Sequence, residues 1–186
     1  MIPLTELWLP ILLSAIAVFV ASSIIHMALP YHRSDYSRIP GEEKFLDATR
    51  PLNLPPGHYV FPHCQSMKET GTPEYQEKLK AGPVGMMTIL PNQPINMGKS
   101  LGCWFVYIAV VSVFAAYLAG RTLSHEAPYL SVFRVAGTAA FAAYALGHTH
   151  NSIWRGERWS TTFKFYFDGL IYSLLTAGFF GWLWPR

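Results

Sequence analysis

Four long apolar stretches constrain what this chain can fold into more than any other feature of its sequence. They cover residues 7–29, 101–120, 129–147 and 163–184, and none has a proline in its middle. Each is close to the ~20 residues that an α-helix needs to cross a ~30 Å hydrocarbon core. Because lipid offers the backbone no hydrogen-bond partners, such a stretch must be helical. We therefore expect an all-α membrane protein with four transmembrane helices.

The remaining sequence divides the chain into three parts. Residues 1–30 hold the first helix, 31–100 form a small mixed insertion between helices 1 and 2, and 101–186 hold helices 2–4. Within the insertion we expect short helices at 40–50, with Pro40 in the first turn, and at 73–80. We expect short strands at 59–61 and 86–90. Because an isolated hairpin is only marginally stable, the insertion should lean on the bundle, on lipid headgroups or on another subunit.

The positive charges predict the orientation in the membrane. The net charge is only +3, which gives no indication of nucleic-acid binding. Cytoplasmic segments collect Lys and Arg close to the membrane. Eight such residues lie between the first two apolar stretches: Arg33, Arg38, Lys44, Arg50, Lys68, Lys78, Lys80 and Lys99. Three more, Arg155, Arg158 and Lys164, accompany the 148–162 loop that we expect before the last helix. We therefore expect a multi-pass protein of the bacterial inner membrane with a cytoplasmic insertion and both termini periplasmic.

The first apolar stretch is interpreted as a retained helix, since no basic residue precedes it as in a signal peptide. Cys64 and Cys103 have no paired spacing, so we expect neither a disulfide nor a metal site.

Small residues at four-residue spacing predict close helix packing. The last stretch carries Gly169, Ser173, Ala177 and Gly181, and the second carries Ser112, Ala116 and Gly120. Such ladders let helix backbones approach closely in lipid. The sequence leaves open whether the partner helix belongs to this chain or to another subunit. The many aromatic residues are typical of the belts at the two membrane interfaces. A pigment- or quinone-binding surface would use the same residue types, so the aromatic residues do not distinguish the two roles.

The candidate cofactor-binding residues are His26, His148, His150 and Asp168, all at the expected cytoplasmic side. Ionisable groups in transmembrane segments are candidate functional residues, and imidazoles can ligate haem iron, bind quinone or relay protons. The structural alternative is that His148 and His150, in a loop at a helix end, interact with the negative terminus of that helix. Lys164 and Asp168, four residues apart, would then neutralise each other on one face of the last helix. Only His26 and His148 approach the placement that a haem requires. No hydrolase motif or transporter-like repeat is present.

Several segments resemble a set of small bacterial inner-membrane proteins of uncharacterised activity. They are residues 26–36 (HMALPYHRSDY), 55–62 (PPGHYVFP), 82–85 (GPVG) and 168–185, which opens DGLIY and ends GWLWP. The resemblance covers most of the chain. It implies a bacterial origin and this architecture, and it implies no activity.

The sequence therefore favours a non-catalytic accessory or scaffold subunit of a larger membrane complex, of the respiratory or photosynthetic type. Its expected partners are membrane lipids and other membrane subunits or further copies of itself. The alternative is a haem- or quinone-binding electron-transfer protein that uses His26 and His148.

Overall fold

The computed structural model describes all of residues 1–186 and is mostly helical, as the sequence predicts. The chain forms two compact units. One comprises Met1–Tyr36 and Asn96–Arg186, and the other comprises Ser37–Ile95. The short 3₁₀ turn η1 (Tyr31–Ser34) thus belongs with the long helices, although the sequence assigned it to the insertion.

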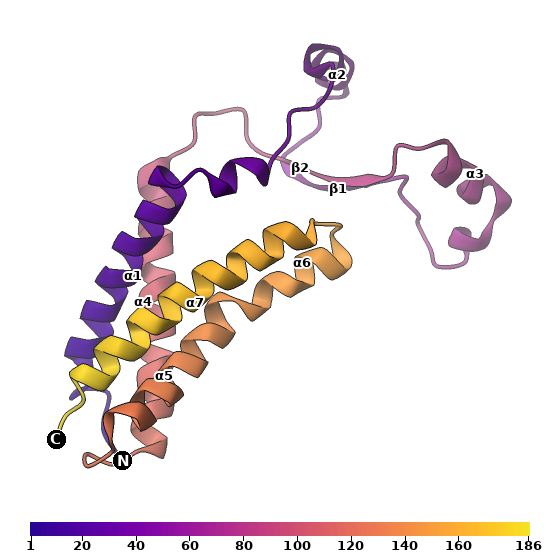
Figure 1. The fold of residues 1–186 in the computed structure, drawn as a ribbon. Coiled ribbons are helices and arrows are strands. Elements are labelled where there is room, and N and C mark those ends of the chain that lie inside the picture. Colours follow the sequence, from indigo (N-terminus) through magenta and orange to yellow (C-terminus); the bar gives the residue numbers. More distant parts are fainter. The chain divides into compact units, whose positions relative to one another are not determined.

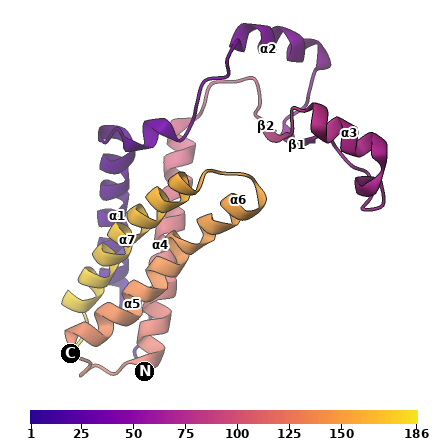
Figure 2. The same ribbon diagram turned by 45° about the vertical axis from the view of Figure 1, so that its right-hand side comes forward.

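The first unit is built from four long helices, α1 (Trp8–Ala28), α4 (Met97–Thr122), α5 (Tyr129–Tyr144) and α7 (Trp159–Trp182). They lie side by side in Figures 1 and 2. α1 and α5 each pack against both α4 and α7, so the helices close into a bundle. Its core has two apolar clusters. The first includes Ile2, Leu7, Ala116, Val132 and Phe180, and the second includes Val18, Ile108, Ala140, Tyr144 and Tyr172.

The third apolar stretch continues further than expected. α5 passes into a 3₁₀ turn, η4 (Leu146–His148), and then into α6 (Thr149–Trp154). The expected loop at 148–162 was therefore wrong, because only residues 155–158 lie outside helices. Side chains hold this extension against α7: Thr149 hydrogen-bonds Tyr166, and the Ser152 and Thr162 hydroxyls lie 2.6 Å apart.

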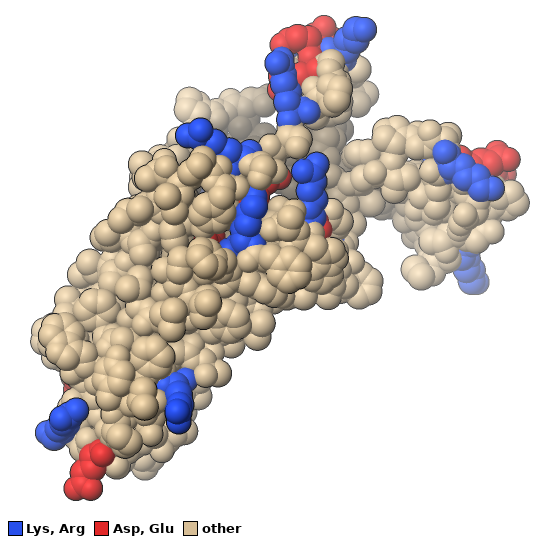
Figure 3. Space-filling model, in the orientation of Figure 1, with Lys and Arg blue, Asp and Glu red and all other residues tan.

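Three helical segments are long and apolar enough to cross a membrane: Trp8–Ala28, Met97–Thr122 and the continuous Tyr129–Trp154. α7, with 24 residues, is long enough but is not among them by composition, since it carries Lys164, Asp168 and several hydroxyl side chains. In the view of Figure 3, charged side chains gather at the two ends of the helical unit, and its flanks are free of them.

The small residues of α7 lie against α5 of the same chain. A Cβ added to Gly169 would come within 2.8 Å of the Cβ of Ala145, and one added to Gly181 would meet the Tyr129 ring at 2.6 Å. Between them, Ser173 and Ala177 are buried, and a Cβ on Gly137 would lie 3.0 Å from that of Ala177.

The small residues of α4 are also buried. The Ser14 hydroxyl of α1 donates to Ser112 at 3.2 Å, and Ala116 is fully buried. The Gly120 carbonyl accepts a hydrogen bond from the Ile2 N–H at 2.8 Å, and a Cβ on Gly120 would lie 2.6 Å from the Ile2 carbonyl oxygen. The N-terminal segment therefore packs where only glycine leaves room.

The second unit contains the two expected short helices and two expected short strands, together with two 3₁₀ turns. They are α2 (Glu42–Thr49), η2 (Arg50–Leu52), β1 (Gly57–Phe61), η3 (Glu69–Gly71), α3 (Pro73–Ala81) and β2 (Gly85–Ile89). β1 and β2 form an antiparallel pair in which Gly57 faces Ile89 and Phe61 faces Gly85. Pro40 does not lie in the first turn of α2. The helix begins at Glu42, and Gly41 before it has a left-handed backbone with φ 70°.

Candidate functional site

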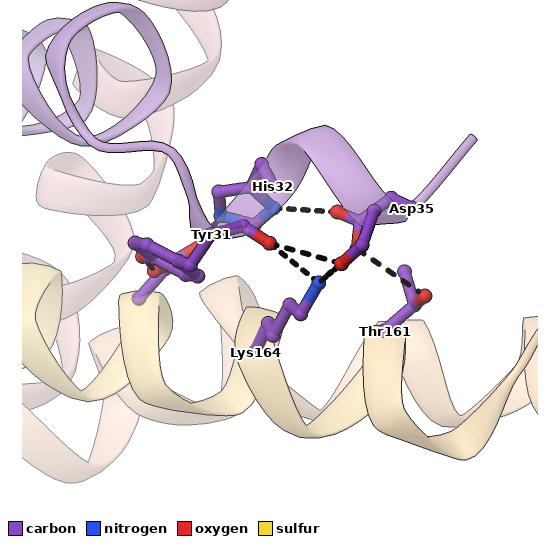
Figure 4. A network of polar contacts seen from close by, with 7 residues as sticks. Tyr31, His32, Asp35, Thr161 and Lys164 are labelled. Carbon is purple, nitrogen blue, oxygen red and sulfur yellow. Dashed lines mark hydrogen bonds and ion pairs between the residues drawn. The ribbon is translucent and has the colours of Figure 1, made fainter. Parts of the chain in front are cut away.

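A group of polar side chains joins the turn after α1 to the first half of α7 (Figure 4). We call it the polar cluster, and it consists of Tyr31, His32, Asp35, Lys164 and Asp168. α1 ends at Ala28 because Leu29 is extended before Pro30, and proline disfavours helix in the residue before it. The 3₁₀ turn η1 that follows places residues 31, 32 and 35 against α7.

Lys164 anchors one end of the polar cluster. Its Nζ donates to Asp35 Oδ1 at 2.5 Å, to the Tyr31 carbonyl at 2.6 Å and to Ser34 Oγ at 2.8 Å. The Thr161 hydroxyl also reaches Asp35, at 3.5 Å. Burial by itself raises the pKa of Asp35, but Lys164 and His32 outweigh it, so the pKa is held below its usual value. Asp35 is therefore an ionised partner of the ammonium group, and its side chain is 7% exposed.

His32 bridges two carboxylates. Its Nδ1 lies 2.6 Å from Asp35 Oδ2, and its Nε2 lies 2.8 Å from Asp168 Oδ2. The Tyr31 hydroxyl donates to the other oxygen of Asp168. Burial and this hydrogen bond raise the pKa of the Tyr31 hydroxyl, so it stays a donor.

The expected pairing of Lys164 with Asp168 was wrong. The two residues share a face of α7, yet η1 lies against that face and divides them: Asp35 takes the ammonium group, and Tyr31 and His32 take the second carboxylate. Asp168 is 1% exposed, and neither Lys nor Arg pairs with it.

His26, in the last turn of α1, lies beside the polar cluster. Its ring centroid is 4.4 Å from that of His32, and the residue is exposed at the surface of the bundle. One ligand atom from each of His26, His32 and Asp168 lies within 4.8 Å of the others. Of the predicted cofactor-binding residues, the structure thus brings His26 and Asp168 together.

The other two predicted histidines lie elsewhere. His148 stacks on Phe165, with ring centroids 4.0 Å apart and 4° between planes, and its buried Nδ1 has no partner. The same phenylalanine is 6.5 Å from the His26 ring, so His26 and His148 share a neighbour. His150 is exposed on α6. Neither residue is in the expected helix-end loop, because His148 lies in η4 and His150 in α6.

Sequence reasoning missed Tyr31, His32 and Asp35 as site residues. Their only signal was the dense polar run directly after an apolar stretch that ends at Pro30. Comparison with protein-family models, with curated proteins and with solved structures finds no match for this chain. Its possible roles therefore follow from its own geometry. The polar cluster can tie η1 to α7, and with His26 it offers two imidazoles and a carboxylate at one point.

Proposed function

We propose that this chain is a four-span protein of the bacterial inner membrane that serves as a non-catalytic accessory or scaffold subunit of a larger membrane assembly. Three helical segments have the length and apolar character to cross the membrane. Two further features support the proposal: the packing of α7, and the exposed character of residues 37–95.

The packing of α7 supports its assignment as the fourth span. It runs antiparallel to α5, with Gly181 against Tyr129 at one end of α5 and Gly169 against Ala145 at the other. If α5 crosses the membrane, α7, which packs along the whole length of α5, lies at the same depth. The 24 residues of α7 reach about 36 Å at 1.5 Å per residue, enough for the hydrocarbon core.

The polar residues of α7 are compatible with lipid because they point inward. Thr162, Asp168 and Thr176 are buried, whereas Phe163, Phe167 and Leu174 are exposed. Polar groups in transmembrane segments usually face the bundle interior. Mean hydropathy averages the buried polar face with the exposed apolar face, so it underestimates how well the outer surface of α7 suits lipid.

The orientation rests on the positive charges. The end of the bundle that holds Lys99, Arg155 and Lys164 is proposed as cytoplasmic, because basic residues collect on that side. Both termini then lie in the periplasm, and residues 37–95 lie in the cytoplasm.

The observation that carries the scaffold role is the absence of a core in residues 37–95. None of these residues is buried in the structure. Cys64, the one cysteine of this unit, is free, so no disulfide replaces the missing core. β1 and β2 form a two-stranded sheet, which leaves a free edge on each strand. Such a segment gains stability when a partner covers it.

One face of the hairpin offers a defined contact surface. Val60 and Met86 face each other in the strand register and are 43% and 59% exposed. Beside them, His58 Nδ1 lies 3.0 Å from Thr88 Oγ1. An exposed apolar pair next to hydrogen-bonding groups suits the centre of a protein interface.

The test is purification from bacterial membranes in a mild detergent, with mass spectrometry of what co-elutes. A membrane subunit should co-elute in a fixed ratio with the wild type and with the control Met67→Glu, whose side chain is already 85% exposed. A Val60→Glu/Met86→Glu double variant should recover at least about tenfold less of it, the effect of about 1.4 kcal/mol in binding.

A wild-type protein that elutes with lipid alone would overturn the scaffold role. A reducible Soret band that disappears in His26→Ala would instead support the haem-binding alternative, for which the absorbance of the same preparation is the check.

A further inference from the structure

We propose that His26, His32 and Asp168 form a binding site for a divalent transition-metal ion of the zinc type. The expectation of no metal site rested on the cysteine spacing alone, and this site uses none of the cysteines. The ligand atoms come from the end of α1, from η1 and from α7. They lie within 4.8 Å of one another although His32 and Asp168 are 136 residues apart in sequence.

The charges of the site favour a cation. Asp35 is compensated by Lys164 at 2.5 Å. The carboxylate of Asp168 is 2% exposed and has only the Tyr31 hydroxyl and the His32 ring as partners. A buried carboxylate without a compensating charge is costly. Two arrangements supply that charge: a doubly protonated His32, or a metal ion held between Nε2 and Asp168.

The surroundings of His32 prepare it as a ligand. Asp35 Oδ2 lies 2.6 Å from Nδ1, so with a metal ion bound it would accept the proton of that nitrogen and leave Nε2, on the side of Asp168, as the ligand atom. A carboxylate behind a histidine is the usual outer partner of zinc-bound imidazole, where it fixes the ring and raises its basicity. Asp35 is itself fixed by Lys164 and Thr161 (Figure 4).

Asp168 is oriented in the same way. Tyr31 donates to Oδ1, which leaves Oδ2 facing His32 at 2.8 Å. Zinc bonds of about 2.1 Å at tetrahedral angles place neighbouring ligand atoms about 3.4 Å apart. The His32 and Asp168 atoms therefore need to separate by only about 0.6 Å. The exposed side chain of His26 has the freedom to close the remaining gap.

The donor set selects the kind of metal. Two imidazole nitrogens with one carboxylate oxygen suit Zn²⁺ and its neighbours among the first-row transition metals, whereas Mg²⁺ and Ca²⁺ prefer all-oxygen sites. Three protein ligands would leave the fourth coordination position of a tetrahedral ion for water or another ligand.

The test measures Zn²⁺ binding to the full-length protein in detergent micelles, by competition with a chelating dye. The wild type should bind one Zn²⁺ per chain and should keep it in an excess of Mg²⁺. His26→Ala is the informative variant because His26 takes no part in the hydrogen bonds of the polar cluster, so the fold stays intact. It should weaken binding at least about tenfold, and Asp35→Asn should weaken it about 10–100-fold.

His150→Ala is the matched control, since His150 is an exposed histidine outside the ligand set. It should leave the affinity unchanged. X-ray absorption of the Zn²⁺-loaded wild type should show nitrogen and oxygen ligands, with imidazole scattering, at about 2.0–2.2 Å. A wild type without stoichiometric Zn²⁺, or equal loss of affinity in His26→Ala and His150→Ala, would overturn the site.

Discussion

At the scale of single residues, the polar cluster divides its charges between two partners. Asp35 pairs with Lys164, and Asp168 depends on Tyr31 and His32. The two halves meet at the His32 ring, which contacts both carboxylates. The connection between η1 and α7 therefore depends on the ionisation of these groups.

Asp35 predicts a pH dependence of stability. The pKa of its carboxyl lies below the ordinary value of 3.8 in the folded protein, so folding favours the ionised form. Its contribution is present above that ordinary value and is lost as the pH falls through the lower, folded value. We expect Asp35→Asn to cost about 1–3 kcal/mol near neutral pH, as for a lost hydrogen bond to a charged group, and the difference from wild type to shrink in acid.

Thermal unfolding in micelles over a range of pH measures this difference. Asp47→Asn is the control, because Asp47 is 71% exposed and paired only with Arg50 at the surface of α2. It should change stability by less than about 0.5 kcal/mol at any pH. A wild-type advantage over Asp35→Asn that is the same in acid as at neutral pH would contradict the role given to this carboxylate.

The sequence could indicate parts of this site but not its pairing. His26 and Asp168 stood out because ionisable groups are rare in apolar stretches. The contact of Asp168 with His32 joins residues 136 positions apart, and a sequence shows only near neighbours. The local rule for helix pairs therefore suggested Lys164 with Asp168, and the tertiary contact with η1 overrides it.

At the scale of elements, α5 and α7 meet through small residues. The four-residue spacing of the ladder on α7 was visible in the sequence, because it follows the helical repeat. Its partner was not visible, since the matching face of α5 includes a glycine, Gly137, and an aromatic ring, Tyr129. The extension of α5 into α6 was missed for a similar reason: it is held by contacts with α7 and not by its own composition.

Enlarging Ala177 should separate these helices. A Cβ on Gly137 would already lie 3.0 Å from that of Ala177, so Ala177→Leu forces the backbones apart and should cost about 1–3 kcal/mol. Gly178→Leu is the matched control, because a Cβ there meets nothing within 4 Å. Heat resistance in micelles compares the two variants. Equal losses would mean that the α5–α7 contact is not close at Ala177.

At the scale of the whole molecule, the sequence predicted the number of long helices and the hairpin in the insertion. Apolar length and turn residues encode these elements locally. α7 is harder to recognise as a span from its apolar length. The polar residues on its inner face, which join it to η1 and α5, lower its mean hydropathy. The central structural claim is thus that α7 crosses the membrane. This crossing decides on which side of the membrane the C-terminus lies.

The most direct test of that claim is the location of reporters fused within the chain and at its end. With four spans, alkaline phosphatase fused after Arg186 should be active in the periplasm, and green fluorescent protein at that position should be dark. Green fluorescent protein inserted after Thr70, in the 37–95 unit, should fluoresce in the cytoplasm. If the C-terminal fusion is cytoplasmic while the insertion at Thr70 is also cytoplasmic, α7 does not cross, and the four-span account is wrong.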